Sequence, residues 1–205
     1  MEHVIAISGP PGAGSTTTAR LLSEELGLKF FSPGRLFKDI ATGRFNKQSY
    51  ASLFREICTK RGINMPDFTG VDDSHGAINL WKTEFGKSPQ LHEAIDELQI
   101  KLGERGGIVL DGKLSIHLIK NAKPKIWLKA FLDERAERAA NRDDVSKDKA
   151  FEIVKKRQET ERAEWKKIYG KDYWEQEKDA DIVIDTTNLL PEQVVEQIIS
   201  KMTNL

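Results

Sequence analysis

A glycine-rich loop near the start of the chain lies between two segments of regular pattern. The loop is GPPGAGST, from Gly9 to Thr16. It follows the apolar run HVIAIS, and it precedes Ala19, Leu22 and Leu26, which recur at helical spacing until Gly27. A strand, a glycine loop and a helix in this order are typical of a parallel α/β fold whose loop binds phosphate groups.

The loop departs from the usual phosphate-binding pattern at one position. In G-x-x-x-x-G-K-[ST], the lysine reaches the β- and γ-phosphates and the hydroxyl binds Mg²⁺. Here Gly9 and Gly14 set the register, Ser15 occupies the lysine position and Thr16 the hydroxyl position. An ordinary turn is the alternative, but the helix that follows adds positive charge to the loop. We therefore expect phosphate binding to be retained, while the charge that assists transfer is missing.

Composition limits the classes of function. The 205 residues are enough for one domain with insertions. Lys plus Arg and Asp plus Glu both number 32, and the pI is near 6.9, which argues against a nucleic-acid partner. Cys58 lies in a helical apolar pattern, which indicates a core residue in a reducing compartment. No apolar run has membrane-spanning length. We expect a soluble, cytoplasmic monomer without a membrane partner.

Short apolar runs alternate with helical patterns along the rest of the chain, which predicts a parallel sheet with helices on both faces. The runs are Leu28–Phe31, Gly107–Leu110, Lys125–Ala130 and Asp181–Asp185. Leu91–Leu102 and Val194–Met202 read as amphipathic helices. Residues 42–87 are less regular and indicate an inserted substrate-side subdomain. Residues 134–169 read as two charged helices joined near residues 143–146.

Several charged residues are candidates for binding anions. Arg135, Arg138 and Arg142 share one helix face and could reach one ligand together, although a solvated charged face is the alternative. Arg157 and Glu161, four residues apart, form either a plain ion pair or an arginine oriented toward phosphate. Both interpretations remain open.

Two strand ends carry further candidates. Asp111 ends the apolar run of IVLDGK, where a carboxylate can hold Mg²⁺ beside the loop, or can simply cap a turn. FFSPGRLFK places Ser32, Arg35 and Lys38 after the second run, where a second anion could dock.

Taken together, these segments resemble the nucleoside monophosphate kinase family, and most closely the archaeal-type cytidylate kinases. The resemblance rests on ISGPPGAGSTTTARLL, FSPGRLFK, IVLDGKL, IWLKAFLDERAERAANR, RQETERAEWKKIYG and ADIVIDTTNLLPEQV, in the family's order. It implies a P-loop NTPase-like three-layer α/β/α domain over residues 1–205, with a five-stranded parallel sheet. It also implies an inserted monophosphate-binding region at about 38–102, a helical lid at about 138–165, and transfer from ATP to CMP or dCMP with Mg²⁺.

The resemblance also implies roles for individual residues. ATP would be bound by Gly9, Pro10, Pro11, Gly12, Ala13, Gly14, Ser15, Thr16 and Thr17, with Arg138 and Arg142 of the lid. Thr16 and Asp111 would hold Mg²⁺. The monophosphate would be bound by Ser32, Gly34, Arg35, Lys38, Lys113, Arg157 and Glu161.

The chain departs from the family at four positions. Ser15 replaces the loop lysine, Lys38 and Lys113 stand where arginine is usual, and Glu164 stands where the lid motif ends in arginine. The leading hypothesis is that another cation compensates. The candidate catalytic cations are Lys113, Arg157, Arg162 and Arg142.

Two alternatives stay open. One is a pseudo-kinase that binds nucleotide as a switch or an assembly partner, and the other is a kinase of the same fold with a different acceptor. The base-reading residues would lie within residues 42–87, where Asp72, Asp73, Ser74 and His75 are polar candidates.

Overall fold

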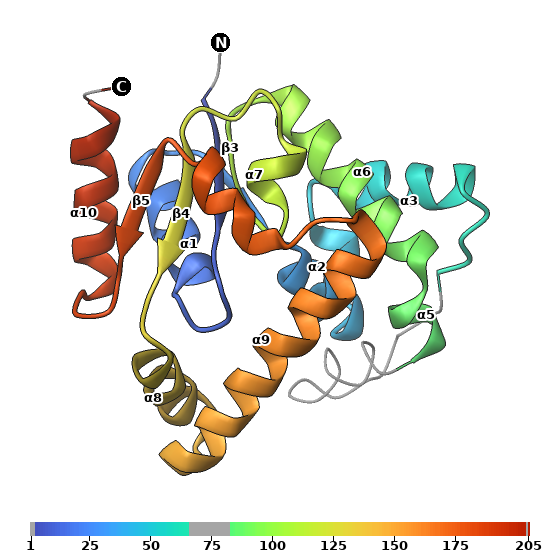
Figure 1. Cartoon of the computed structure of the whole chain (residues 1–205). Helices are drawn as coiled ribbons and strands as arrows, with labels where there is room; N and C mark the ends of the chain where they lie inside the picture. The colour runs from blue at the N-terminus through green and yellow to red at the C-terminus, as the bar shows by residue number, and fades with distance from the viewer. Residues whose placement is uncertain (1–2, 66–82, 204) are drawn as a thin grey trace. The chain divides into compact units, whose positions relative to one another are not determined.

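The structure is a computed structural model that describes residues 3–65, 83–203 and 205. Its centre is a five-stranded parallel sheet with strand order β2-β3-β1-β4-β5 (Figure 1). The strands are β1 (Val4–Ser8), β2 (Lys29–Phe31), β3 (Ile108–Asp111), β4 (Lys125–Lys129) and β5 (Ile182–Asp185). The predicted α/β fold is thus confirmed, and each predicted run coincides with a strand whose ends differ from those of the run by at most one residue.

The chain divides into two compact units, residues 1–30 with 107–205, and residues 31–106. The helices of the first unit are α1 (Ser15–Glu25), α7 (Ser115–Leu118), α8 (Leu132–Asp143), α9 (Lys147–Tyr169), η2 (Tyr173–Asp179) and α10 (Pro191–Met202). In the described part of the second unit, the helices are α2 (Pro33–Ala41), η1 (Phe45–Lys47), α3 (Ala51–Lys60), α5 (Glu84–Lys87) and α6 (Pro89–Arg105).

The first unit has helices on both faces of the sheet, as the alternating sequence pattern predicts. Helices α1 and α10 cover one face, where Leu22 and Ile198 pack against Ile126 and Leu128. Helices α7 and η2 lie on the other face, where Trp127 meets Tyr173 with ring centroids 6.4 Å apart. Neighbouring residues of β4 point to opposite faces, which is why Trp127 lies apart from its neighbours.

The charged segment forms the two helices that were expected, with α8 ending at Asp143 and α9 beginning at Lys147. Alanines dominate their contact: Ala139, Ala140 and Ala150 pack with Val154. Small side chains allow the two helices to approach closely, so little apolar area holds them together.

The second unit has its own aromatic core. Phe45 packs edge-on against Phe54 with ring centroids 5.8 Å apart, and α3 packs against α6. Tyr50 donates its hydroxyl to Asp39, at 3.0 Å. Cys58 is buried, and burial raises the pKa of its thiol to about 11, which favours the predicted core role over a nucleophile. The candidates Asp72, Asp73, Ser74 and His75 lie outside the described residues.

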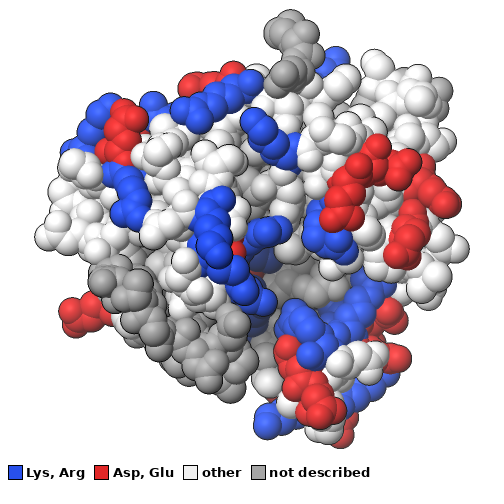
Figure 2. Space-filling model, turned by 180° about the vertical axis from the view of Figure 1, so that it is seen from behind, with Lys and Arg blue, Asp and Glu red and all other residues white. Residues whose placement is uncertain are grey.

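Surface charge is mixed in sign. Figure 2 shows basic and acidic side chains interspersed on the face seen from behind. Within residues 3–65 and 83–203, no helix is long and apolar enough to cross a membrane.

Candidate active site

The glycine loop is held tightly between β4 and α8. A Cβ on Gly9 would lie 2.5 Å from the carbonyl oxygen of Leu128, and one on Gly12 would lie 2.9 Å from Cβ of Arg135. Gly12 and Gly14 have φ of 83° and 91°, a backbone conformation that disfavours other residues. Gly14 is the N-cap of α1 and no side chain caps this helix. The first N–H groups of α1 are therefore suited to an anion.

A carboxylate and a hydroxyl meet beside the loop. Thr16 donates its hydroxyl to Oδ2 of Asp111 at 2.6 Å. The contact follows from the sheet, since β1 and β3 pair in parallel with Ile7 opposite Asp111, so the residues after both strands leave the same edge. Burial raises the pKa of Asp111, while hydrogen bonds from Thr16 and Ser15 and the charge of Lys113 lower it in part.

These two oxygen ligands fit a magnesium ion. Mg²⁺ is commonly bound through one or two protein groups together with phosphates and water, rather than in an all-protein cage. A divalent cation would stabilise the ionised form of the buried Asp111. Among the described residues there is no group of three His, Cys, Asp or Glu side chains able to hold a metal ion. Thr16 and Asp111 are therefore the residues that would hold such an ion, and this role remains a prediction.

Lys113 contacts the loop from the neighbouring strand end. Its ammonium donates to the carbonyl oxygen of Gly9 at 3.0 Å and lies 3.2 Å from Oε2 of Glu161. The other carboxylate oxygen of Glu161 accepts from Nε of Arg157 at 2.7 Å. Burial lowers the pKa of Lys113, with the charge of Glu161 opposing this shift. Three of the sequence-predicted residues thus form one cluster, and two cations share a single carboxylate.

The arginines of α8 do not act as one face. Arg135 is 3% exposed and donates to the carbonyl oxygens of Pro11 and Ala130. It therefore connects the loop to the segment before α8. Arg138 is near Gly14, where its Nη1 would lie 4.0 Å from an added Cβ. Arg142 is largely exposed and pairs with Asp143. The three arginines of the predicted shared face therefore lie in three different environments. Arg135 is buried and bonded to the loop, Arg138 lies near Gly14, and Arg142 is largely exposed.

Arg162 is engaged elsewhere. Its Nε donates to Oδ2 of Asp172 at 2.9 Å, and its guanidinium lies 4.8 Å from the ring centroid of Trp174. Both partners are at the start of η2, so this arginine ties α9 to η2.

Four of the candidate monophosphate residues, Ser32, Gly34, Arg35 and Lys38, belong to the second unit and lie at the N-cap of α2 or within this helix. Ser32 is the N-cap of α2 and accepts from the backbone N–H of Arg35 at 3.2 Å. Gly34 is in the first turn, with no atom within 4 Å of an added Cβ. Lys38 lies in the last turn. Their role remains a prediction.

Two residues that sequence reasoning missed lie next to Lys113. Tyr173 is 1% exposed, and its ring centroid lies 5.4 Å from the Lys113 ammonium. Gln176 is 4% exposed and donates to the carbonyl oxygen of Lys113 at 2.7 Å. Both come from η2, in the charged run YWEQEKD, whose sequence has no helical or strand periodicity that would predict burial.

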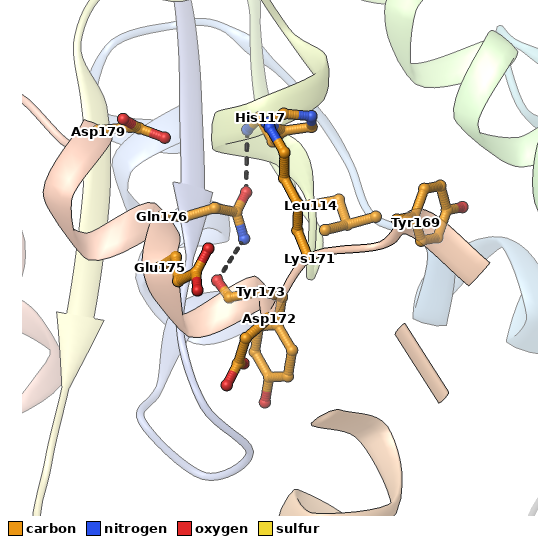
Figure 3. A pocket seen from close by; sticks show the side chains of 9 residues that line it. All are labelled: Leu114, His117, Tyr169, Lys171, Asp172, Tyr173, Glu175, Gln176 and Asp179. Atoms are coloured by element: carbon orange, nitrogen blue, oxygen red, sulfur yellow. Dashed lines mark hydrogen bonds between the residues drawn. The ribbon is translucent and has the colours of Figure 1, made fainter. Parts of the chain in front are cut away.

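The same η2 residues line a small hollow of about 100 Å³ on the side of the first unit shown in Figure 3. Gln176 spans it, accepting from the backbone N–H of His117 and donating to the carbonyl oxygen of Tyr173. Burial lowers the pKa of His117, and the nearby Lys120 and Lys171 lower it further. The amide of Gln176 is fully used by these contacts, which indicates a structural support rather than a ligand site.

Comparison with known proteins finds relatives that span nearly the whole chain. The family model described as "Cytidylate kinase-like family" matches residues 4–188. A cytidylate kinase of Ignicoccus hospitalis is 31% identical over 196 residues, covering 95% of this chain and 96% of that protein. One of Methanocaldococcus jannaschii is 30% identical and covers 98% of each.

Solved structures agree on the fold. An uncharacterized protein from Eubacterium ventriosum has a TM-score of 0.65 at 16% identity and covers 100% of both chains. Shikimate kinase from Acinetobacter baumannii, in complex with shikimate, has a TM-score of 0.54 at 17% identity, covering 100% of this chain and 94% of that one. Because the family model and the archaeal relatives span nearly the whole sequence, the chain belongs to the cytidylate kinase-like family.

Proposed function

We propose that the protein is a nucleoside monophosphate kinase that transfers the γ-phosphoryl group of ATP to CMP or dCMP with Mg²⁺. The observation that carries the proposal is the contact of Thr16 with Asp111 beside a glycine loop whose following helix has no side-chain cap. This arrangement suits a triphosphate and its metal ion. The archaeal relatives named cytidylate kinase support the choice of acceptor.

Each candidate residue has a place in this proposal. The loop from Gly9 to Thr17 binds the phosphates of ATP, with Arg138 and Arg142 contributing from the lid. The residues proposed to bind the monophosphate are Ser32, Gly34, Arg35, Lys38, Lys113, Arg157 and Glu161. The acceptor region would span about 38–102 and the lid about 138–165. We expect a monomer that works in the cytoplasm.

The reaction needs little covalent help from the protein. An oxygen of the acceptor phosphate forms a bond to the γ-phosphorus of ATP, and the bond from that phosphorus to the bridging oxygen breaks, which leaves ADP. The acceptor oxygen is already anionic, so a strong general base is not required. The protein's task is to hold the two polyanions in line and to neutralise charge on the transferred group.

A pseudo-kinase is the second candidate, and Ser15 is the observation that favours it. Loss of one preorganised positive group from a phosphoryl-transfer site lowers the rate by roughly 10²–10⁵-fold. A protein with this loss could bind nucleotide and act through conformational change alone.

The test is phosphoryl transfer by the purified protein with ATP and Mg²⁺, using CMP, dCMP, UMP, AMP, GMP and dTMP as acceptors. We expect turnover with CMP or dCMP, and loss of turnover in EDTA. Asp111→Asn serves as the matched variant for the metal site and should lose at least about 10²-fold in kcat.

Ser15→Lys separates the candidates. Activity in the wild type supports the proposal directly. Silence in the wild type with activity in Ser15→Lys would identify a disarmed kinase, and silence in both would overturn the kinase proposal. Turnover of another acceptor alone would overturn the assignment of CMP and dCMP.

A further inference from the structure

A positive charge reaches the loop from the neighbouring strand instead of from the loop itself. Lys113 follows β3 by two residues, and the parallel pairing of β3 with β1 places this segment beside the loop that follows β1. Its ammonium bonds to Gly9, the first glycine of that loop, at 3.0 Å. The sheet topology therefore delivers a cation to the loop despite Ser15.

The backbone of Lys113 is fixed by two buried side chains. Its carbonyl oxygen accepts from Oγ of Ser8 at 3.0 Å and from Nε2 of Gln176 at 2.7 Å. Ser8 is 1% exposed and Gln176 is 4% exposed. Two buried donors on one carbonyl leave the peptide little freedom to move.

The ammonium is held as well as the backbone. It lies over the ring of Tyr173, 5.4 Å from the centroid, which is within the range of a favourable cation–π contact. The Tyr173 hydroxyl forms no hydrogen bond within the described part of the chain. The ring, rather than the hydroxyl, is therefore what contacts Lys113.

The local charge leaves room for an anion. Lys113 and Arg157 share Glu161, whose Oε2 lies 3.2 Å from the Lys113 ammonium without hydrogen-bond geometry. Asp111 is a further carboxylate close enough to interact with the charge of Lys113. If Asp111 holds Mg²⁺ as proposed, Lys113 and Arg157 face Glu161 alone, and a phosphate group at the loop would supply the missing negative charge.

The other candidate cations are less suited to the role. Arg162 is bound to Asp172, and Arg142 is largely exposed and bound to Asp143. Arg157 donates its Nε to Glu161. Arg138 lies near the loop, but its guanidinium donates to Glu134, Thr186 and Thr187. Of the four candidate catalytic cations, Lys113 is the one with a direct bond to the loop backbone.

We propose that the Lys113 ammonium takes the part of the missing loop lysine in binding the ATP phosphates, with Tyr173 and Gln176 as positioning residues that hold it in place. The inference rests on the proposed function. It assigns to Lys113 the donor phosphates of ATP rather than the acceptor phosphate alone.

The test is a rescue experiment on Lys113→Met. Calorimetric titration with ATP·Mg and, separately, with CMP should show ATP·Mg affinity reduced about 10-fold or more, and a loss of CMP affinity that is smaller than the loss for ATP·Mg. Turnover should fall by roughly 10²–10³-fold. Ser15→Lys in the same chain should recover most of both losses, because it returns a cation to the loop. Lys120→Met, an exposed lysine outside the site, is the matched control.

A second arm tests the positioning residues. Tyr173→Leu and Gln176→Leu should each weaken ATP·Mg binding by about fivefold. Tyr173→Phe, which keeps the ring, should bind ATP·Mg with the affinity of the wild type. Ser15→Lys should also offset the Tyr173→Leu loss. A loss that Ser15→Lys fails to offset indicates general damage to the fold and overturns the positioning role. Thermal unfolding of each variant identifies such damage independently.

The outcomes separate this inference from the proposed function. If Lys113→Met keeps wild-type ATP·Mg affinity and turnover, or loses only CMP affinity, the inference is overturned while the kinase stands. If ATP·Mg affinity depends on Lys113 as described but no acceptor is phosphorylated, the proposed function fails and the role of Lys113 stands.

Discussion

At the residue scale, Arg135 explains how a loop without its lysine keeps its shape. Its guanidinium donates to the carbonyl oxygens of Pro11 and Ala130, and also to Oε1 of Gln158 at 2.7 Å. An added Cβ on Gly12 would touch its side chain at 2.9 Å. A buried charged donor with three acceptors stabilises the loop strongly, because each acceptor would otherwise lose its partner.

Arg135→Met should lower the free energy of unfolding by about 2–4 kcal/mol, since it leaves buried acceptors unsatisfied. Urea unfolding at pH 7, followed by circular dichroism, measures the change. Arg142→Met is the matched control on the same helix, because Arg142 is largely exposed, and it should change stability by no more than about 0.5 kcal/mol. Equal effects of the two substitutions would contradict a supporting role for Arg135.

At the element scale, α9 depends on its two ends. Of its 23 residues, Ala150 and Val154 are buried, and both lie in the N-terminal part that packs on α8. Near its other end, Arg162 binds Asp172, which also accepts from the backbone N–H of Trp174 at 3.1 Å. This carboxylate therefore joins α9 to the first turn of η2, the element that carries Tyr173 and Gln176.

Asp172→Asn should lower the free energy of unfolding by about 1–2 kcal/mol at pH 7. Burial raises the pKa of Asp172, but the hydrogen bonds from Arg162 and Trp174, with the charges of Arg162 and Lys166, outweigh it and hold this pKa below its usual value. A carboxyl group whose pKa is lower in the folded state contributes stability that is fully present above its unfolded-state pKa. This stability is lost as the pH falls through the folded-state pKa.

The difference between wild type and Asp172→Asn should accordingly shrink below about pH 4, where the unfolded carboxyl begins to protonate. Chemical unfolding at pH 7, 5, 4 and 3 measures it. Asp179→Asn, an exposed aspartate of the same element, is the control. A difference that stays constant down to pH 3 would show that the hydrogen-bond geometry, and not the charge of Asp172, joins the two elements.

At the scale of the whole molecule, the chain has no net charge that would attract anions, so an anion must be bound by a local group of side chains and backbone N–H groups. Equal numbers of basic and acidic residues give no net charge, and both signs occur over the face in Figure 2. Binding to the folded state alone stabilises it by mass action. Nucleotide binding at the loop should therefore raise the unfolding temperature, while general polyanions should not.

ATP with Mg²⁺ at 100 times its Kd should raise the free energy of unfolding by about 2.7 kcal/mol. For a chain of this size, this corresponds to a rise in Tm of roughly 5–10 °C. Differential scanning calorimetry measures the shift, with and without EDTA. Asp111→Asn should lose the part of the shift that depends on Mg²⁺, and tripolyphosphate without a nucleoside provides the control for nonspecific binding. No shift at millimolar ATP would count against both the kinase and the pseudo-kinase.

Much of the fold was predictable from local pattern. The strand before the loop, the helices with Leu91–Leu102 and Val194–Met202, and the junction at residues 143–146 follow from periodicity and turn residues. Asp111 at a strand end, Thr16 after the glycines, and Ser15 between Gly14 and Thr16 could be singled out as candidates from their positions along the chain.

The pairing of charged residues was not predictable in the same way. By spacing, Arg135, Arg138 and Arg142 share one helix face. In the structure, the first is buried, the second lies near Gly14, and the third is largely exposed. Tyr173 and Gln176 have no signal in the sequence around them, since their burial depends on contacts with the distant Lys113.

The amino-acid sequence by itself determined the order of strands and helices, the glycine loop and the absence of a lysine from it, because each depends on neighbours within a few residues. Only the tertiary structure decided that Lys113, among the candidate catalytic cations, lies against the loop. That choice depends on parallel pairing of β1 with β3 and on donors from η2, some sixty residues away from Lys113 along the chain. Such contacts form between segments whose separation the local pattern does not record.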